Sequence, residues 1–179
     1  MKWKEHIPAL GAPLLAAAIL AIASVAFNDL HALRASEELH TQLTTLLPGS
    51  TSFTHKAGEG GEVLALYEGS GGTVAQVRVK GYIYDVEMLV AVDTRGRVTG
   101  LVVRDAHETL GLGNAILRDY DFLSRFLKTE GQAEIGKDIQ PITGATVSSR
   151  AVSRCVSAAV AAVTGVDVPS QATPWGDAP

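Results

Sequence analysis

The chain has 179 residues, a formal net charge of −4 and one cysteine, Cys155. This length allows one domain with its own core after an N-terminal apolar segment. The acidic balance, without a basic stripe interleaved with aromatic residues, argues against a nucleic-acid partner. A single cysteine excludes an internal disulfide, a cysteine-ligated cluster and a zinc knuckle, and its small, mostly apolar neighbours predict a buried structural thiol.

The first segment is long and apolar. Residues 7–27 contain no charged residue, and a run of about 21 residues is long enough to cross a bilayer as a helix. Lys2 and Lys4 precede it, and the stretch that follows is acidic or neutral as far as Arg34. This charge bias predicts a membrane anchor with a cytoplasmic N-terminus and everything after residue 28 outside. A cleaved signal peptide is the alternative, since residues 24–26 (SVA) would suit a signal peptidase.

Residues 28–47 are predicted to form a helix that leads from the membrane into the soluble domain, ended by Pro48-Gly49. The leucines at helical spacing are Leu30, Leu33, Leu39, Leu43, Leu46 and Leu47. Residues 49–62 are rich in Gly, Ser, Thr and charge, so a loop or irregular extended chain is expected there.

Short strands are predicted next. Their ranges are 63–67, 73–79, 86–92 and 97–104. Residues 69–72 form a turn, and DTRGR at 93–97 has the composition of a hairpin turn. Short strands joined by tight turns favour an antiparallel or mixed sheet over a doubly wound parallel one.

Two helices are predicted in the second half. Asn114 can cap a helix that runs to about Leu127. Its expected apolar face comprises Ile116, Leu117, Tyr120, Leu123 and Leu127. Ser148 or Ser149 can cap another that runs to Val163 and ends at residues 164–165.

Residues 143–146, just before the last helix, read TGAT. The hydroxyls of Thr143 and Thr146 are their only reactive groups. A helix N-terminus presents unpaired N–H groups and a positive dipole end, and a preceding glycine lets the backbone approach a ligand closely. These features suit a phosphate. The alternative is a plain capped helix with a glycine turn.

A second unusual stretch, HETLGLG at residues 107–113, follows an apolar strand. The glycines allow close packing against a flat surface, Leu110 and Leu112 are apolar, and residues 107–109 offer hydrogen bonds. A flat aromatic ligand with a polar edge would suit this loop. The alternative is a tight strand-to-helix connection with a charged rim.

Together, HETLGLG and TGAT resemble the FMN-binding domain family, which includes the G subunit of the Rnf electron-transport complex and the C subunit of the sodium-pumping NADH:quinone reductase. The resemblance covers residues 1–165 and implies FMN attached covalently, through its phosphate, to Thr146. It also implies that residues 143–145 line the phosphate and ribityl chain and that the 107–112 loop contacts the isoalloxazine ring. The implied cofactor-binding residues are His107, Glu108, Thr109, Leu110, Gly111, Leu112, Thr143, Gly144, Ala145, Thr146 and Val147.

The chain departs from the family pattern at two positions. Leu110 stands where family members usually have proline. Gln140 stands where many have an acidic residue, six positions before the modified threonine, and Asp138 lies two residues earlier. This acid is thought to matter to the flavin transferase that installs the cofactor.

The fold class that the resemblance implies is α+β: one N-terminal transmembrane helix followed by a single FMN-binding domain, whose twisted, mostly antiparallel sheet packs against helices. The expected parts are a cytoplasmic N-terminus with the transmembrane helix, a membrane-proximal helix, the FMN-binding domain and a C-terminal tail. Their ranges are 1–28, 29–48, 49–168 and 169–179.

Because the chain lacks the insertions usual in the quinone reductase subunit, it resembles the Rnf subunit more closely. The implied function is electron relay within an ion-translocating ferredoxin:NAD⁺ oxidoreductase, without independent catalysis and without a metal site. The implied partners are the other Rnf subunits, a flavin transferase and the lipid bilayer. The implied location is the bacterial inner membrane, as a single-pass protein with the FMN domain on the periplasmic side. The alternatives are the quinone reductase subunit, a stand-alone periplasmic flavin carrier, or a membrane-tethered non-redox scaffold.

Overall fold

The computed structural model describes residues 33–106 and 119–166. The chain divides into two units, Met1–Thr41 and Gln42–Pro179. Residues 33–46 are helical and end in a turn at residues 47–49, which confirms the helix predicted there as far as it is described. None of the described helices has the length and hydropathy of a membrane span. The predicted anchor at residues 7–27 lies outside the described residues.

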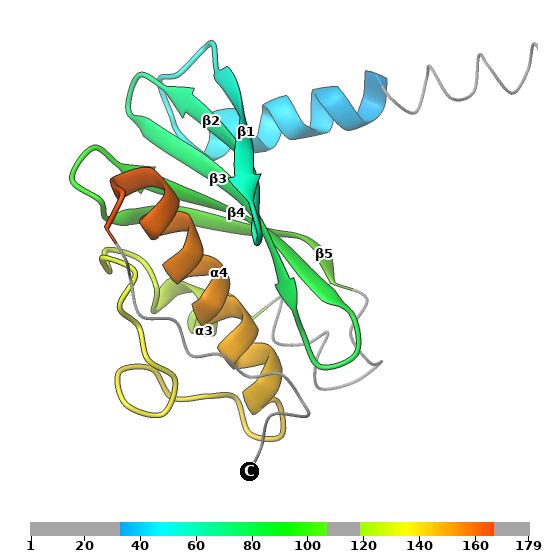
Figure 1. Ribbon diagram of the computed structural model, residues 1–179, viewed down its shortest axis with the longest axis vertical. Coiled ribbons are helices and arrows are strands. Elements are labelled where there is room, and N and C mark those ends of the chain that lie inside the picture. The colour runs from blue at the N-terminus through cyan, green and yellow to red at the C-terminus, as the bar shows by residue number, and fades with distance from the viewer. Residues whose placement is uncertain (1–32, 107–118, 167–179) are drawn as a thin grey trace, which may run out of the picture. The chain divides into compact units, whose positions relative to one another are not determined.

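The second unit is built on a five-stranded antiparallel sheet in which each strand pairs with the next one along the chain (Figure 1). The strands are β1 (Thr54–Gly60), β2 (Val63–Gly69), β3 (Gly72–Lys80), β4 (Asp85–Asp93) and β5 (Val98–Ala106). The sequence predicted the last four strands from their apolar residues, and their short length and tight turns favoured the antiparallel or mixed arrangement that the structure has. The DTRGR turn is also confirmed, since the Asp93 backbone N–H donates to the Arg97 carbonyl over 2.8 Å.

The expectation of a loop or irregular extended chain over residues 49–62 is wrong at residues 54–60, where β1 forms the first edge of the sheet. Its side chains are mostly exposed, so the strand shows no apolar alternation. Backbone pairing holds it instead, with a cross-strand ion pair of 2.6 Å between Lys56 and Glu68. Gly58 permits this pairing, since a Cβ there would meet the Val63 carbonyl oxygen at 1.9 Å.

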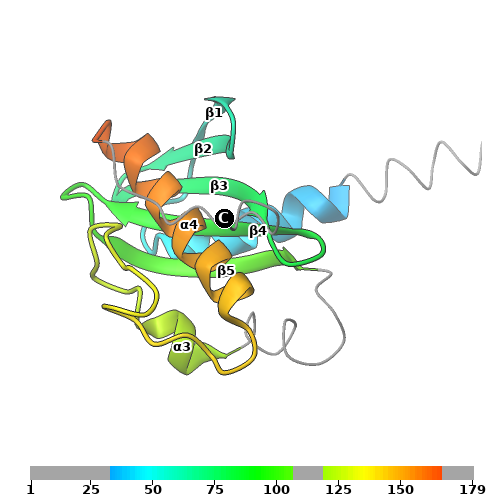
Figure 2. The same ribbon diagram turned by 60° about the horizontal axis from the view of Figure 1, so that its bottom comes forward.

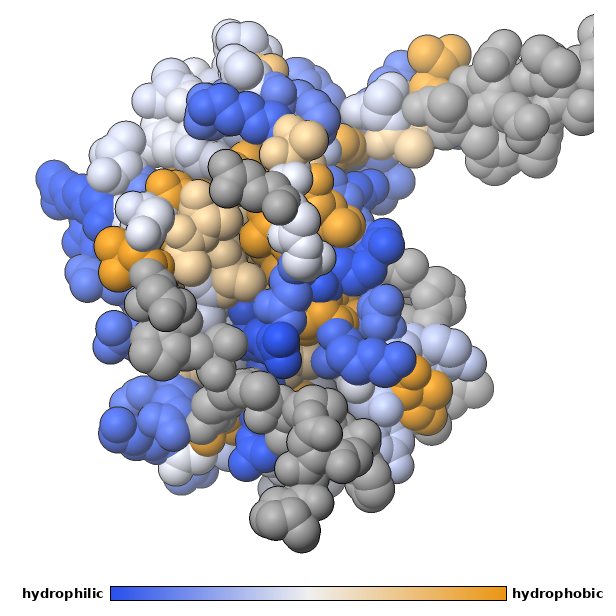
Figure 3. All heavy atoms as spheres, viewed as in Figure 1, coloured by the Kyte–Doolittle hydropathy of each residue, from blue (hydrophilic) through white to orange (hydrophobic). Residues whose placement is uncertain are grey.

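One long helix, α4 (Thr146–Thr164), crosses β3 and β4 and covers one face of the sheet (Figure 2). Its buried residues recur at the spacing of an amphipathic helix. The fully buried core beneath it includes Val77, Val86, Met88, Val90, Val92, Val152, Cys155 and Val156. On the face seen in Figure 3, apolar side chains gather over the last turns of α4, where Ala158, Ala161 and Val163 are only partly buried.

Cys155 is fully buried in this core, as the sequence predicts. Burial raises the pKa of its thiol, because the apolar surroundings disfavour the thiolate. Since the thiolate is the reactive form of cysteine, this side chain is a packing group.

Within its described part, the helix predicted over residues 114–127 is confirmed only at residues 120–124, and the apolar face predicted for it is partly wrong. The structure has a short helix, α3 (Tyr120–Ser124), whose cap Asp119 accepts a hydrogen bond from the Phe122 N–H over 3.1 Å. Tyr120 is 85% exposed, and the buried side chains are Leu123 and two phenylalanines, Phe122 and Phe126. The phenylalanine rings meet edge to face at 5.4 Å, and their burial turns Tyr120 outward. The proposed cap at Asn114 and the residues up to 118 lie outside the described range.

Candidate functional site

The TGAT stretch forms a tight turn followed at once by α4. The Ala145 N–H donates to the Ile142 carbonyl over 3.0 Å, which closes a four-residue turn. Gly144 has φ +83°, a left-handed conformation that glycine adopts at little cost. Thr143, Gly144 and Thr146 are exposed, whereas the Ala145 methyl group is buried. The turn therefore presents both threonines to solvent.

The helix begins earlier than the sequence predicted. Ser148 and Ser149 were expected to cap it, but α4 starts at Thr146, and both serines lie buried in its first turn. Ala145 occupies the cap position and has no side-chain oxygen to accept a bond from the first N–H groups. An alanine cap costs about 0.5–2 kcal/mol relative to serine or threonine. The helix start is thus left without a side-chain acceptor, beside the exposed Thr146.

A cation lies one turn after Thr146. The Nε atom of Arg150 is buried and has no hydrogen-bond partner within the described part of the chain. Helical side chains generally lean toward the N-terminus, and Arg150 lies four residues after Thr146, on the same face of α4. Arg154, one turn further on, is already paired with Glu62. No acidic residue occupies the first turn of α4.

The start of α4 and the end of β5 lie at the same end of the sheet (Figures 1 and 2). At the opposite end, a Cβ on Gly96 would lie 2.8 Å from Thr164, the last residue of α4. Near the middle of α4, the Cys155 sulfur lies 3.9 Å from the Val86 carbonyl oxygen. Val86 pairs in turn with Ala106, the last residue of β5. The chain therefore enters the HETLGLG stretch at the end of the sheet toward which the first turns of α4 point.

The residues predicted for the isoalloxazine ring lie outside the described range. They are His107, Glu108, Thr109, Leu110, Gly111 and Leu112. The residues predicted for the phosphate and ribityl chain are described and contiguous. They are Thr143, Gly144, Ala145, Thr146 and Val147. The structure thus describes one half of the predicted site.

Sequence reasoning overlooked a feature of the same end of the sheet. The hairpin between β3 and β4 carries Tyr82, Ile83 and Tyr84, which are 47%, 45% and 56% exposed. A bond of 2.9 Å from the Gly81 N–H to the Tyr84 carbonyl closes the hairpin. The signal was three large apolar or aromatic residues in the short connection between two predicted strands, where small polar residues are usual.

Asp138, the acidic residue nearest the position usual in the family, belongs to a local turn. Its carboxylate accepts a hydrogen bond from the Glu134 N–H over 3.0 Å. Gln140 is exposed, and its backbone carbonyl accepts a bond of 3.5 Å from Arg125. The departure noted in the sequence therefore places an amide, and no carboxylate, at position 140.

A buried carboxylate lies on the sheet face opposite α4. Glu87 accepts hydrogen bonds from Gln76 over 2.7 Å and from Arg78 over 2.6 and 3.1 Å, and Arg104 lies 3.7 Å away. Burial alone would raise the pKa of Glu87, but the bonds from Arg78 and Gln76 outweigh it and hold that pKa below its usual value. Because its neighbours already occupy both oxygens, this cluster, completed by Tyr67, is structural.

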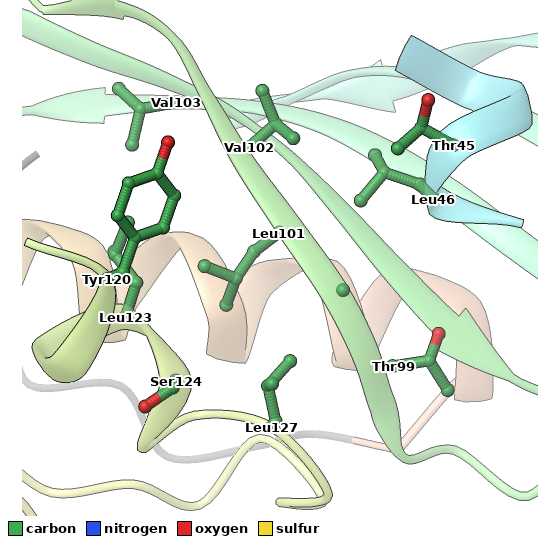
Figure 4. Close-up of a pocket in the computed structure, with 11 residues that line it drawn as sticks. Thr45, Leu46, Thr99, Leu101, Val102, Val103, Tyr120, Leu123, Ser124 and Leu127 are labelled. Carbon is green, nitrogen blue, oxygen red and sulfur yellow. The ribbon is translucent and has the colours of Figure 1, made fainter. Parts of the chain in front are cut away.

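A separate apolar pocket of about 490 Å³ lies along the outer edge of β5 (Figure 4). Residues of β5, α3 and the end of the N-terminal helix line it, among them Leu46, Leu101, Val103, Tyr120, Leu123 and Leu127. None of residues 142–150 lines it, so the pocket is distinct from the turn at Thr146. Over the described ranges, no group of His, Cys, Asp and Glu is arranged to hold a metal ion.

Comparison with known families bears directly on this turn. Residues 81–161, from the exposed hairpin through most of α4, match the FMN-binding domain family. This stretch of the chain is similar to FMN-binding domains. The match includes both TGAT and HETLGLG, so the resemblance seen in the sequence is confirmed. The matched residues comprise β4, β5, the 142–145 turn and most of α4.

About half of the chain also aligns with named proteins. One is the G subunit of the proton-translocating ferredoxin:NAD(+) oxidoreductase complex of Clostridium ljungdahlii, 36% identical over 51% of this chain and 52% of the relative. The G subunit of the ion-translocating oxidoreductase complex of Escherichia coli is 37% identical over 44% of this chain and 43% of the relative. The G subunit of the Na(+)-translocating ferredoxin:NAD(+) oxidoreductase complex of Acetobacterium woodii is 32% identical over 55% of each chain. The chain spans about half the length of the curated relatives it matches.

The described residues fit the phosphate end of FMN. An anion there would meet the helix start that no side chain caps and the positive end of its dipole. The orphaned Nε of Arg150 would supply a positive charge one turn away. The exposed hydroxyl of Thr146 is the nucleophilic atom nearest the helix start.

Proposed function

We propose that this chain is an electron-relay subunit of an Rnf-type ion-translocating ferredoxin:NAD⁺ oxidoreductase complex and carries FMN covalently on Thr146. The match to the FMN-binding domain supports the cofactor. The similarity to proteins named as G subunits of such complexes supports the assembly. The role is that of a carrier, with no catalysis by this chain alone.

The observation that carries the proposal is the position of Thr146. Its hydroxyl is exposed, and it is the first residue of a helix without a side-chain cap. A phosphodiester there keeps one negative charge at neutral pH. The helix dipole stabilises such a charge by about 0.3–1 kcal/mol, which orients the group, while the covalent bond retains it. Arg150 adds a counter-charge.

The remaining residues proposed to contact FMN fall into two groups, one for each end of the cofactor. Thr143, Gly144, Ala145 and Val147 would line the phosphate and ribityl chain, and residues 107–112 would contact the ring system. Bound FMN supplies one- and two-electron transfer, and the protein positions it and adjusts its potential. The exposed turn leaves the attachment point open to a flavin transferase.

The proposed surroundings follow from the sequence. The apolar segment at residues 7–27 would anchor the chain in the bacterial inner membrane, with the N-terminus in the cytoplasm and the FMN-binding domain outside. Covalent attachment suits that location, where free FMN is scarce. The partners would be the other membrane and peripheral subunits of the complex, the transferase and the lipid bilayer.

Flavin retention under denaturing conditions tests the attachment. The full chain, produced with a flavin transferase, is denatured in acid, separated on a gel and examined for flavin fluorescence, and its intact mass is measured. We expect one FMN adduct in the wild type and in Thr143→Ser, and none in Thr146→Ala. A Thr146→Ala chain that keeps covalent flavin would show that the site is wrong.

Purification from native membranes separates the candidate functions. We expect the tagged chain to carry flavin and to co-purify with other membrane redox subunits. A flavin-bearing chain that purifies alone would indicate a stand-alone carrier. A colourless chain of unmodified mass within its native complex would indicate a non-redox scaffold and would remove the proposed function.

A further inference from the structure

We propose that Ser149 is a positioning residue for flavin attachment, because its hydroxyl holds the 142–145 turn in the conformation that presents Thr146. This inference rests on the proposed attachment at Thr146. Ser149 is fully buried, so it does not itself reach a ligand in solvent. Its effect must pass through the backbone that it binds.

Two hydrogen bonds from one hydroxyl tie the two ends of the turn together. The Ser149 Oγ donates to the Ala145 carbonyl over 2.9 Å and accepts from the Ile142 N–H over 3.3 Å. The Ala145 carbonyl also accepts the first helical bond, from the Ser149 N–H over 3.0 Å. Ser149 therefore links the residue that opens the turn to the residue that caps the helix.

This linkage replaces a missing cap. A helix start is usually fixed by a Ser, Thr, Asp or Asn side chain at the cap position, and here that residue is Ala145. A serine inside a helix commonly bonds back to the carbonyl four residues earlier, which uses only its donor. Ser149 also uses its acceptor, so the turn is held from within the helix, and no side chain at the cap position occupies the N–H groups at its start.

Neighbouring serines provide a matched comparison. Ser153 and Ser157 lie one and two turns further along the same buried face of α4. Their hydroxyls donate to the carbonyls of Ala133, over 2.6 Å, and Gly131, over 2.7 Å. Neither of these bonds reaches the turn before Thr146. Ser153 is therefore a control of the same residue type, helix and burial, with a different target.

The step that Ser149 would assist is a transfer from a flavin dinucleotide. The oxygen of Thr146 forms a bond to the FMN phosphorus, the bond from that phosphorus to the AMP oxygen breaks, AMP leaves, and the hydroxyl proton passes to solvent. No electrons are exchanged. Because the rate of such a displacement depends on the alignment of the attacking oxygen, a misplacement of about 1 Å can cost about a hundredfold.

The rate of attachment is the decisive measurement. The full chain in detergent is incubated with a flavin transferase and flavin adenine dinucleotide, and the adduct is followed by intact mass. We expect Ser149→Ala to react at least about tenfold more slowly than wild type at saturating dinucleotide, and Ser153→Ala to stay within about twofold. Ser149→Cys keeps a side chain of similar size and a weak hydrogen-bond donor, so its rate of attachment should lie between the rates of Ser149→Ala and wild type.

A second measurement shows whether the effect is local. Amide hydrogen exchange at Ile142 should rise in Ser149→Ala and stay unchanged in Ser153→Ala. Equal rates for Ser149→Ala and wild type would overturn the inference. So would a slowing of both alanine variants in proportion to their loss of thermal stability. A wild-type chain that never gains an adduct would instead refute the attachment at Thr146, and this inference with it.

Discussion

At the scale of single residues, the sequence predicted an attachment residue, Thr146, but not the residues that hold its turn in place. Thr146 was recognised because TGAT is a contiguous motif, and contiguous motifs can be read from sequence. Ser149 was interpreted as a helix cap, because its two bonds to the 142–145 turn depend on where the helix starts. Arg150 drew no attention, since only the structure shows that its Nε lacks a partner among the described residues.

Arg150 provides a prediction at this scale. Arg150→Gln should lower the rate or the equilibrium yield of flavin attachment by about two- to fivefold, since a partly exposed ion pair contributes up to about 1 kcal/mol. The loss should shrink at high salt, because salt screens the pair. Intact mass at two ionic strengths measures both effects.

Arg154→Gln is the matched control for this prediction. It removes a cation from the next turn of α4 that is already paired with Glu62. We expect a change in thermal stability and no salt-dependent change in attachment. Equal effects of the two variants on attachment would mean that Arg150 has no specific role at the phosphate.

At the scale of elements, the strands with one buried face were predictable and the others were not. Apolar residues marked β2 to β5, because each of these strands has side chains against the core. The edge strand β1 has little apolar surface and depends on backbone pairing, which leaves no trace in composition. The face of α3 was misread because helical spacing alone does not distinguish Tyr120 from the neighbouring phenylalanines.

The carboxylate cluster on the sheet yields a prediction about pH. The pKa of Glu87 is lower in the folded chain than in the unfolded one. Its contribution to stability is therefore present above the unfolded pKa, near 4.5, and is lost as the pH falls through the lower folded value. We expect Glu87→Gln to lower the free energy of unfolding at pH 7 by about 1–3 kcal/mol. Below pH 4 the difference should narrow.

Chemical unfolding at a series of pH values checks this expectation. Glu68→Gln is the control, since Glu68 forms an exposed pair with Lys56 on the same sheet. Exposed pairs contribute about 0–1 kcal/mol, so this variant should change little at any pH. A constant difference between Glu87→Gln and wild type across the series would contradict the pKa argument.

At the scale of the whole domain, the site depends on how one helix lies on one sheet. Thr146 has its position because α4 packs across β3 and β4 through buried residues such as Met88, Val152 and Val156. The sequence predicted an antiparallel sheet and a final helix, but not which strands the helix covers. That choice depends on side-chain packing between segments far apart in the chain.

A core substitution tests this dependence. Met88→Ala should lower the free energy of unfolding by about 2–5 kcal/mol, because Met88 is fully buried beneath α4. Flavin attachment should then fall only in proportion to the unfolded fraction. Leu127→Ala, at a side chain that is 39% exposed, should cost much less. Denaturant titration with adduct mass on the same samples measures both quantities.

The strand order has a consequence for how the chain matures. Since every strand pairs with its sequence neighbour, the sheet can assemble hairpin by hairpin through short-range contacts. The helix must instead close a long loop before it docks, which is the slower event. The threonine at its first residue is therefore among the last parts of the domain to reach its final place. Under the proposed attachment at Thr146, we expect modification to follow docking of α4, so that a half-folded chain is a poor acceptor for the cofactor.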